Sequence, residues 1–232
     1  MYARLSVAAV VSLIFAAQSA NAQLCAGAAS FTTGRMQAGG QLLSNDDYSS
    51  YGVGLGVGNA RGLFGGAQIA NNDYDFVDES GLWLGASGGY QMQPSKTGFQ
   101  VCPVASVGFG MGPDNIGGSE TDLSVREISA GAIIGKLVHR EGSLQVIPTG
   151  GLSFVSTKVT LDAPGASEDV SDTFFALNVG AGLVVNSVWT IRPMLSLPFG
   201  ADGRDESISL NVSYNFGKRA SSAARPPARK SR

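Results

Sequence analysis

The stretch that most constrains the fold is the run of residues 207–216, which reads SISLNVSYNF. Every even position is apolar or aromatic, and every odd position is Ser or Asn. Strict alternation with period two indicates a β-strand whose two faces meet different environments. At about 3.3 Å per residue and a tilt of about 40°, nine residues rise about 23 Å, close to the roughly 25 Å apolar band of a membrane barrel. The stretch therefore predicts the last strand of a transmembrane β-barrel.

The first 22 residues have the features of a secretory signal peptide. A single charge at Arg4 precedes an apolar run over 5–17, and Ala20-Asn21-Ala22 forms an A-x-A cleavage site. No later stretch approaches the roughly 20 apolar residues that a membrane helix requires. We therefore predict an exported mature chain of about 210 residues, a length that suits one all-β domain followed by a tail.

Turn signals divide the mature chain into ten alternating segments. Connections after even-numbered segments are short, and those after odd-numbered segments are longer and polar, as in outer-membrane barrels. We predict an all-β fold: one antiparallel up-and-down barrel over residues 23–216, with ten strands, or eight as the alternative because the first and third segments alternate weakly. The segments cover about 32–42, 49–58, 62–70, 81–92, 99–111, 123–137, 144–154, 175–185, 189–199 and 207–216.

Aromatic residues on the apolar faces fall into two groups. One group lies near the short connections and the other near the long ones, which predicts two aromatic girdles at two membrane interfaces. The first group is Tyr90, Phe99, Trp189, Tyr214 and Phe216, and the second is Tyr51, Phe109, Phe154, Phe175 and Phe199.

Charges also sort by position along the chain. Of the 18 acidic residues, all but Glu127 and Glu141 lie in or beside the longer connections. They are either solvated loop residues or sites where divalent cations bridge to lipopolysaccharide phosphates. Residues 217–232 carry six basic side chains and no apolar residue larger than alanine, so we predict a disordered basic tail. This tail is either loose or binds anionic lipid head groups or cell-wall polymer.

Two cysteines, Cys25 and Cys102, are present, and an exported chain favours their pairing. The alternatives are a lipidated Cys25, which Leu24 disfavours because lipoprotein signals usually have a small residue there, and two free buried thiols. Cys102 shares the inward parity of Gln100. An N-terminal segment that folds under or into the mouth of the barrel would reach it.

These features resemble small outer-membrane β-barrel proteins of the OmpA-like and opacity-protein kind. The resemblance covers about 32–216 and rests on the signal peptide, the glycine-rich inner faces and the strand starts at Pro103, Pro148 and Pro193. It implies a monomer in the outer membrane of a Gram-negative cell, in contact with membrane lipid and lipopolysaccharide. It also implies that the last strand is read by the barrel-assembly machinery, through Leu210, Val212, Tyr214 and Phe216.

The sequence offers little for catalysis. Barrel enzymes are expected to use a histidine as acid or base, and the one histidine, His139, lies in a short connection. Two distant cysteines and one histidine cannot form a tetrahedral metal site. We expect no enzyme activity, no cofactor, no metal site and no nucleic-acid partner.

The inner face is expected to carry charges that need partners, namely Arg35, Glu127 and Arg192. Pairing of either arginine with Glu127 is favoured over a selectivity filter. We expect a structural or surface-interaction barrel with acidic external loops and a narrow or plugged lumen. The alternatives are a narrow, porin-like pore for small solutes and a secreted lipocalin-like binding barrel.

Overall fold

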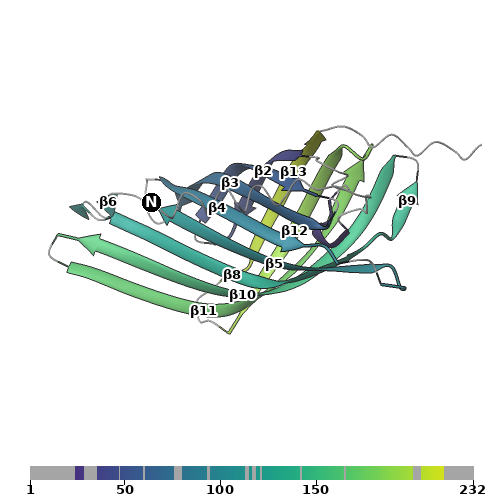
Figure 1. Cartoon of the computed structure of the whole chain (residues 1–232). Coiled ribbons are helices and arrows are strands. Elements are labelled where there is room, and N and C mark those ends of the chain that lie inside the picture. The colour runs from purple at the N-terminus through teal and green to yellow at the C-terminus, as the bar shows by residue number, and fades with distance from the viewer. Residues whose placement is uncertain are drawn as a thin grey trace, which may run out of the picture.

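A computed structural model describes residues 24–28, 36–46, 48–59, 61–75, 80–92, 95–112, 115–116, 119–120, 122–141, 143–164, 166–200 and 205–216. The predicted signal peptide and basic tail lie outside these residues. The described part of the chain forms a closed antiparallel barrel (Figure 1).

Ten long strands follow one another around the barrel in sequence order, and each pairs with the next, β10 with β11 included. The last strand, β13, pairs with the first, β1, and this pairing closes the circle. The predicted all-β, ten-stranded up-and-down barrel is confirmed, and the eight-stranded alternative is wrong. The strands are β1 (Met36–Ser44), β2 (Tyr48–Gly58), β3 (Leu63–Tyr74), β4 (Ser80–Tyr90), β5 (Phe99–Met111), β8 (Asp122–Lys136), β10 (Leu144–Ala163), β11 (Ala166–Val185), β12 (Trp189–Phe199) and β13 (Ser207–Phe216).

Four short elements complete the described fold. They are the 3-10 helix η1 (Leu24–Ala26), the small hairpin β6 (Asn115–Ile116) and β7 (Ser119–Glu120), and β9 (His139–Glu141), which pairs with the start of β10. Within the described residues, no helix has the length and apolar character needed to cross a membrane.

The two ends of the barrel differ. At the end we call the turn end, the strands are joined by 59–62, 91–98, 137–143 and 186–188. At the opposite end, the hairpin end, β10 and β11 continue well beyond most of the other strands (Figure 1). They pair without interruption from Leu144 with Val185 to Ala163 with Ala166.

This hairpin corrects our prediction that all connections after odd-numbered segments are long. Two of them are short, 45–47 and 164–165, and residues 155–163 and 166–174 are strand where we expected polar loop. Residues 155–160 read VSTKVT, rich in the β-branched side chains that favour strands. Pairing with β8 on the far side of β10, up to Asp162 with Asp122, adds a third strand for part of this length.

The outward face is apolar between two aromatic rows, as predicted. On β12, Trp189 and Phe199 both point outward and are ten residues apart, and on β5 Phe99 and Phe109 repeat this spacing. Ten residues at about 3.3 Å each, tilted by about 40°, rise about 25 Å. At the hairpin end, Phe175 packs between Phe154 and Phe199, with ring centroids 5.6 and 5.8 Å apart.

Around the deeper part of the lumen the inward side chains are mainly small and polar, and two aromatic side chains lie over glycines. The ring of Trp83 lies along the wall against Gly108 and Gly110 of β5, where a Cβ at Gly108 would overlap the indole. Phe64 lies similarly against Gly89. These two aromatics interrupt the sequence alternation because they fill the lumen and do not join the outer surface.

Candidate functional site: a disulfide-anchored segment in the lumen

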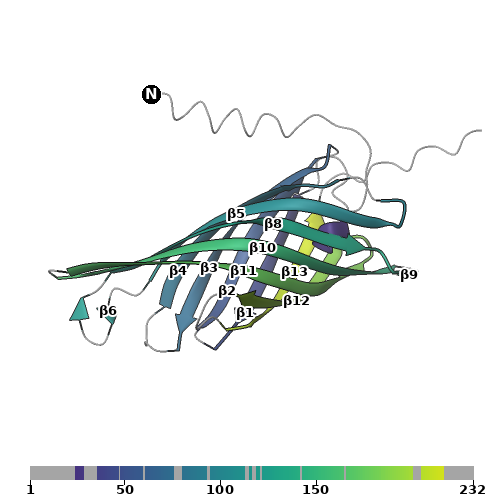
Figure 2. The ribbon, with the colours of Figure 1, turned by 90° about the horizontal axis from the view of Figure 1, so that it is seen from below.

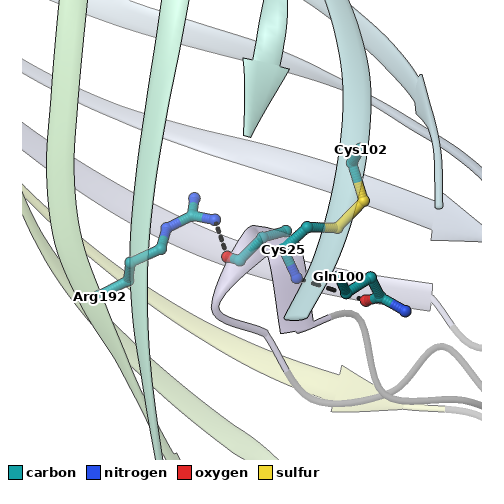
Figure 3. The surroundings of a disulfide bond; sticks show 5 residues. Cys25, Gln100, Cys102 and Arg192 are labelled. Carbon is teal, nitrogen blue, oxygen red and sulfur yellow. Dashed lines mark hydrogen bonds between the residues drawn. A yellow bond between two sulfur atoms is a disulfide. The ribbon is translucent and has the colours of Figure 1, made fainter. Parts of the chain in front are cut away.

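The N-terminal segment Leu24–Ala26 lies inside the barrel near the turn end (Figure 2). A disulfide joins Cys25 to Cys102 of β5, with a Cα–Cα distance of 5.9 Å (Figure 3). The pairing predicted from sequence is therefore present. Both cysteines are fully buried, as are Ile147 and Val184, which pack with Leu24 in a small apolar cluster.

Two glycines of the wall make room for the backbone of this segment. A Cβ at Gly135 of β8 would overlap the carbonyl oxygen of Leu24, and a Cβ at Gly182 of β11 would overlap the carbonyl oxygen of Gly27. Gly27 itself has φ = 60° and donates to Leu24 O at 3.1 Å, which closes the turn. Glycine is the residue that adopts such a left-handed conformation without steric cost.

Two polar side chains of the wall bind the backbone of the segment (Figure 3). The Cys25 N–H donates to Oε1 of Gln100 on β5, at 3.4 Å. From β12, Nη1 of Arg192 donates to the carbonyl oxygen of Ala26, at 2.7 Å. A charged donor strengthens this second hydrogen bond. The segment is thus held covalently on one side and by a guanidinium on another.

The predicted pairing of Arg192 with Glu127 is not observed. Arg192 binds backbone and makes no ion pair with Glu127, although both line one cavity. This contact could not be predicted from sequence, because a backbone carbonyl acceptor leaves no side-chain pattern. Arg35, the other predicted partner of Glu127, lies outside the described residues.

Two contiguous cavities occupy the rest of the described lumen. The deeper one, about 390 Å³, includes Glu127 and Arg192 in its lining. The outer one, about 720 Å³, lies toward the hairpin end and is lined by Tyr48, Tyr74 and Asp205 among others. Four residues line both: Gln41, Gln68, Trp83 and Glu127. The described lumen is therefore a space that runs from the anchored segment toward the hairpin end, with many polar residues around the deeper cavity and a mixed lining, which includes Val155 and Val159, around the outer one.

The other residues singled out from the sequence lie outside the lumen. His139 is exposed on β9, with Nε2 at 3.5 Å from a carboxylate oxygen of Glu141. No group of three or more His, Cys, Asp or Glu side chains suited to a metal ion occurs in the part of the chain that the structure describes. The proposed assembly residues Leu210, Val212, Tyr214 and Phe216 all point outward on β13; their role in assembly stays a prediction.

No protein-family model and no curated protein matches the sequence. Solved structures do match the fold. The translocator domain of autotransporter NalP from Neisseria meningitidis is similar with a TM-score of 0.50 and 10% identity, over 80% of this chain and 88% of that one. This degree of identity shows a shared β-barrel fold and no more.

Smaller barrels are similar over nearly their whole length. The N-terminal β-barrel domain of Pseudomonas aeruginosa OprF matches 79% of this chain and 100% of its own, with 12% identity and a TM-score of 0.38. Neisserial surface protein A matches 85% of this chain and 98% of its own, with 11% identity and a TM-score of 0.40.

Proposed function

We propose that this chain is an outer-membrane barrel with a structural or surface-interaction role, whose lumen is closed at the turn end. The observation that carries the membrane assignment is the outward band between the aromatic rows. Its exposed side chains, among them Val53, Leu55, Ile128, Leu152 and Val179, are apolar, and a water-soluble monomer rarely exposes so large a contiguous apolar surface.

The interior supports the same assignment. A secreted lipocalin-like barrel would hold its apolar side chains inside, whereas here glutamine, serine and glycine are prominent in the lining of the deeper cavity and a band of apolar side chains faces outward. The partners proposed for this outer surface are membrane lipid and, in the leaflet nearest the hairpin end, lipopolysaccharide.

The hairpin is the feature that suits a surface role. Residues 155–174 extend about 30 Å along the strands beyond the Phe154 and Phe175 row. Among the described residues, β11 pairs with β10 alone up to Phe174, so no described strand covers its other edge. Acidic side chains on this edge strand, Glu168, Asp169 and Asp172, are the kind of residue that keeps an open edge from pairing with other chains.

We infer a closed lumen because the segment at its turn end is fixed by a covalent bond. The purified oxidised chain, inserted in planar bilayers, is expected to give no steady conductance. Insertion is verified in the same preparation by protection of the barrel from added protease in liposomes. Steady single-channel conductance of the oxidised chain would instead favour the second candidate, a narrow pore.

The pore candidate rests on the two contiguous cavities. A variant lacking both cysteines, Cys25→Ser with Cys102→Ser, separates the two candidates further. If the anchored segment is the barrier, this variant should conduct at least intermittently while the oxidised wild type remains silent. If both are silent, the barrier is the wall of the lumen itself and the pore candidate is excluded.

A further inference from the structure

The level of the lumen around Trp83 combines an aromatic face with uncharged amides. Residue pairing places Gln41, Gly52, Ala70, Trp83 and Gly110 in one row across β1 to β5. One face of the indole lies on the glycine backbone of β5. Since Trp83 also lines both cavities, the opposite face is presented to the lumen.

Amide groups stand beside this aromatic face. The Nε2 of Gln68 and the Nε1 of Trp83 both approach Gly85, within 3.1 and 3.3 Å of where a Cβ would stand. Gln41 of β1 is in the same row of paired residues as Trp83, and like Gln68 it lines both cavities. Among the described residues, neither Gln41 nor Gln68 has a side-chain hydrogen-bond partner, so their donors and acceptors are available to a molecule in the lumen.

The charges of the outer cavity restrict what this site can hold. Among the residues that the structure describes, the charged side chains lining the outer cavity are Glu127 and Asp205, both acidic, and Arg192 lines only the deeper cavity. An anionic molecule would enter toward the Asp205 carboxylate, and the described lining of this cavity offers it no cation. The volume, about 720 Å³, is within the usual range of small-molecule sites, about 300–1,000 Å³.

We propose that the lumen at the level of Trp83 binds a neutral polyhydroxylated molecule of the saccharide class. The C–H face of a sugar ring packs on the indole, and the amides of Gln68 and Gln41 exchange hydrogen bonds with its hydroxyls. This binding is independent of where the protein resides and of whether the lumen conducts.

The two tryptophans of the chain allow a direct test, because Trp83 faces the lumen and Trp189 faces outward. In the Trp189→Phe variant of the full chain, folded in detergent, maltotriose is expected to change the Trp83 fluorescence saturably. Titration extends to about 100 mM, because a weak site has a Kd of about 1 mM. The Trp83→Phe variant, which reports from Trp189, should remain unchanged.

Substitution of the amides tests the contacts. In the Trp189→Phe background, Gln68→Met with Gln41→Met should weaken binding about fivefold or more, since the hydroxyls lose their partners. Gln145→Met, an inward amide near the turn end that lines neither cavity, is the matched control and should bind normally. Unaltered binding in the double variant would overturn the assigned contacts.

Charged probes of similar size decide the chemical class. Trigalacturonate, the anionic counterpart, should bind at least about tenfold more weakly than maltotriose, because the Asp205 carboxylate repels it and the described lining of the outer cavity offers it no cation. Three results would overturn the proposal: no saturable response to maltotriose, equal responses to the neutral and anionic sugars, or a response to spermidine alone, which would make this a cation site.

Discussion

Arg192 of β12 donates a hydrogen bond from Nη1 to the carbonyl oxygen of Ala26, at 2.7 Å, across the lumen from the Cys25–Cys102 disulfide. The guanidinium is thereby used to hold a backbone segment that the sequence places far from it, 166 residues away. The hydrogen bond thus connects β12 with a segment that is covalently attached to β5.

Loss of this contact should make the disulfide easier to reduce. Cys25 and Cys102 are fully buried, so a reductant reaches them only when the segment opens. A hydrogen bond to a charged group contributes about 1.5–3 kcal/mol. Arg192→Met should therefore raise the rate at which dithiothreitol reduces the disulfide by about 10- to 100-fold. The rate is measured by alkylating the free thiols at successive times and detecting them by mass spectrometry. The reduction rate of Arg192→Lys, which keeps a cationic donor, should lie between those of wild type and Arg192→Met. A rate for Arg192→Met within about twofold of the wild-type rate would contradict the contact.

Filling the space that Gly135 leaves for Leu24 should prevent the segment from docking. In Gly135→Val, the side chain would occupy the position of the Leu24 carbonyl oxygen. We expect loss of the disulfide in the folded barrel, seen as two reactive thiols without reductant. Gly150→Ala is the control, because the nearest atom to its Cβ would be 3.8 Å away. A fully formed disulfide in Gly135→Val would show that the segment docks elsewhere.

The ion pair on the extended hairpin should be visible in a titration. The side-chain hydrogen bond from Lys158, at 2.8 Å, and then that from Thr160 lower the pKa of Asp169 below its ordinary value of 3.8. A folded pKa that is lowered adds stability above the unfolded pKa, and this contribution is lost as pH falls through the folded value.

Lys158→Met should therefore move the Asp169 pKa back toward 3.8, measured by NMR of the side-chain carboxyl carbon. Lys158→Arg keeps the charge and should leave the pKa lowered. An unchanged pKa in Lys158→Met would mean that the hairpin strands are not paired in this register.

The barrel wall could be predicted from sequence because each strand separates two environments. The alternation in Ser207–Phe216, and the ten-residue spacing of Phe99 and Phe109, follow directly from lipid on one side and a polar lumen on the other. Parity also placed Cys102 and Gln100 inward. Each strand of the wall alternates outward apolar with inward small or polar residues, so the strands can be found from short stretches of sequence.

The contents of the lumen and the extended hairpin follow no such rule. Gly135 and Gly182 look like any other inward glycine, and only the docked backbone gives them a role. Arg192 was expected to pair with a carboxylate, but its Nη1 donates to a backbone carbonyl oxygen. Residues 155–163 lie beyond the apolar band, and their apolar members Val155, Val159 and Leu161 fall on the parity that faces the lumen, so the outward apolar pattern ends there although the pairing of β10 with β11 continues.

The central claim, that this barrel spans a membrane with β13 facing lipid, is tested by one pair of adjacent substitutions. Val212 points outward in the apolar band, and Asn211 lines the polar cavity. The free energy of unfolding in lipid vesicles should fall by about 2–4 kcal/mol for Val212→Arg, because an arginine near the midplane faces hydrocarbon. Asn211→Arg should cost less, since its guanidinium remains in a wet, polar lumen. Equal costs at the two positions, or a larger cost at Asn211, would contradict the account.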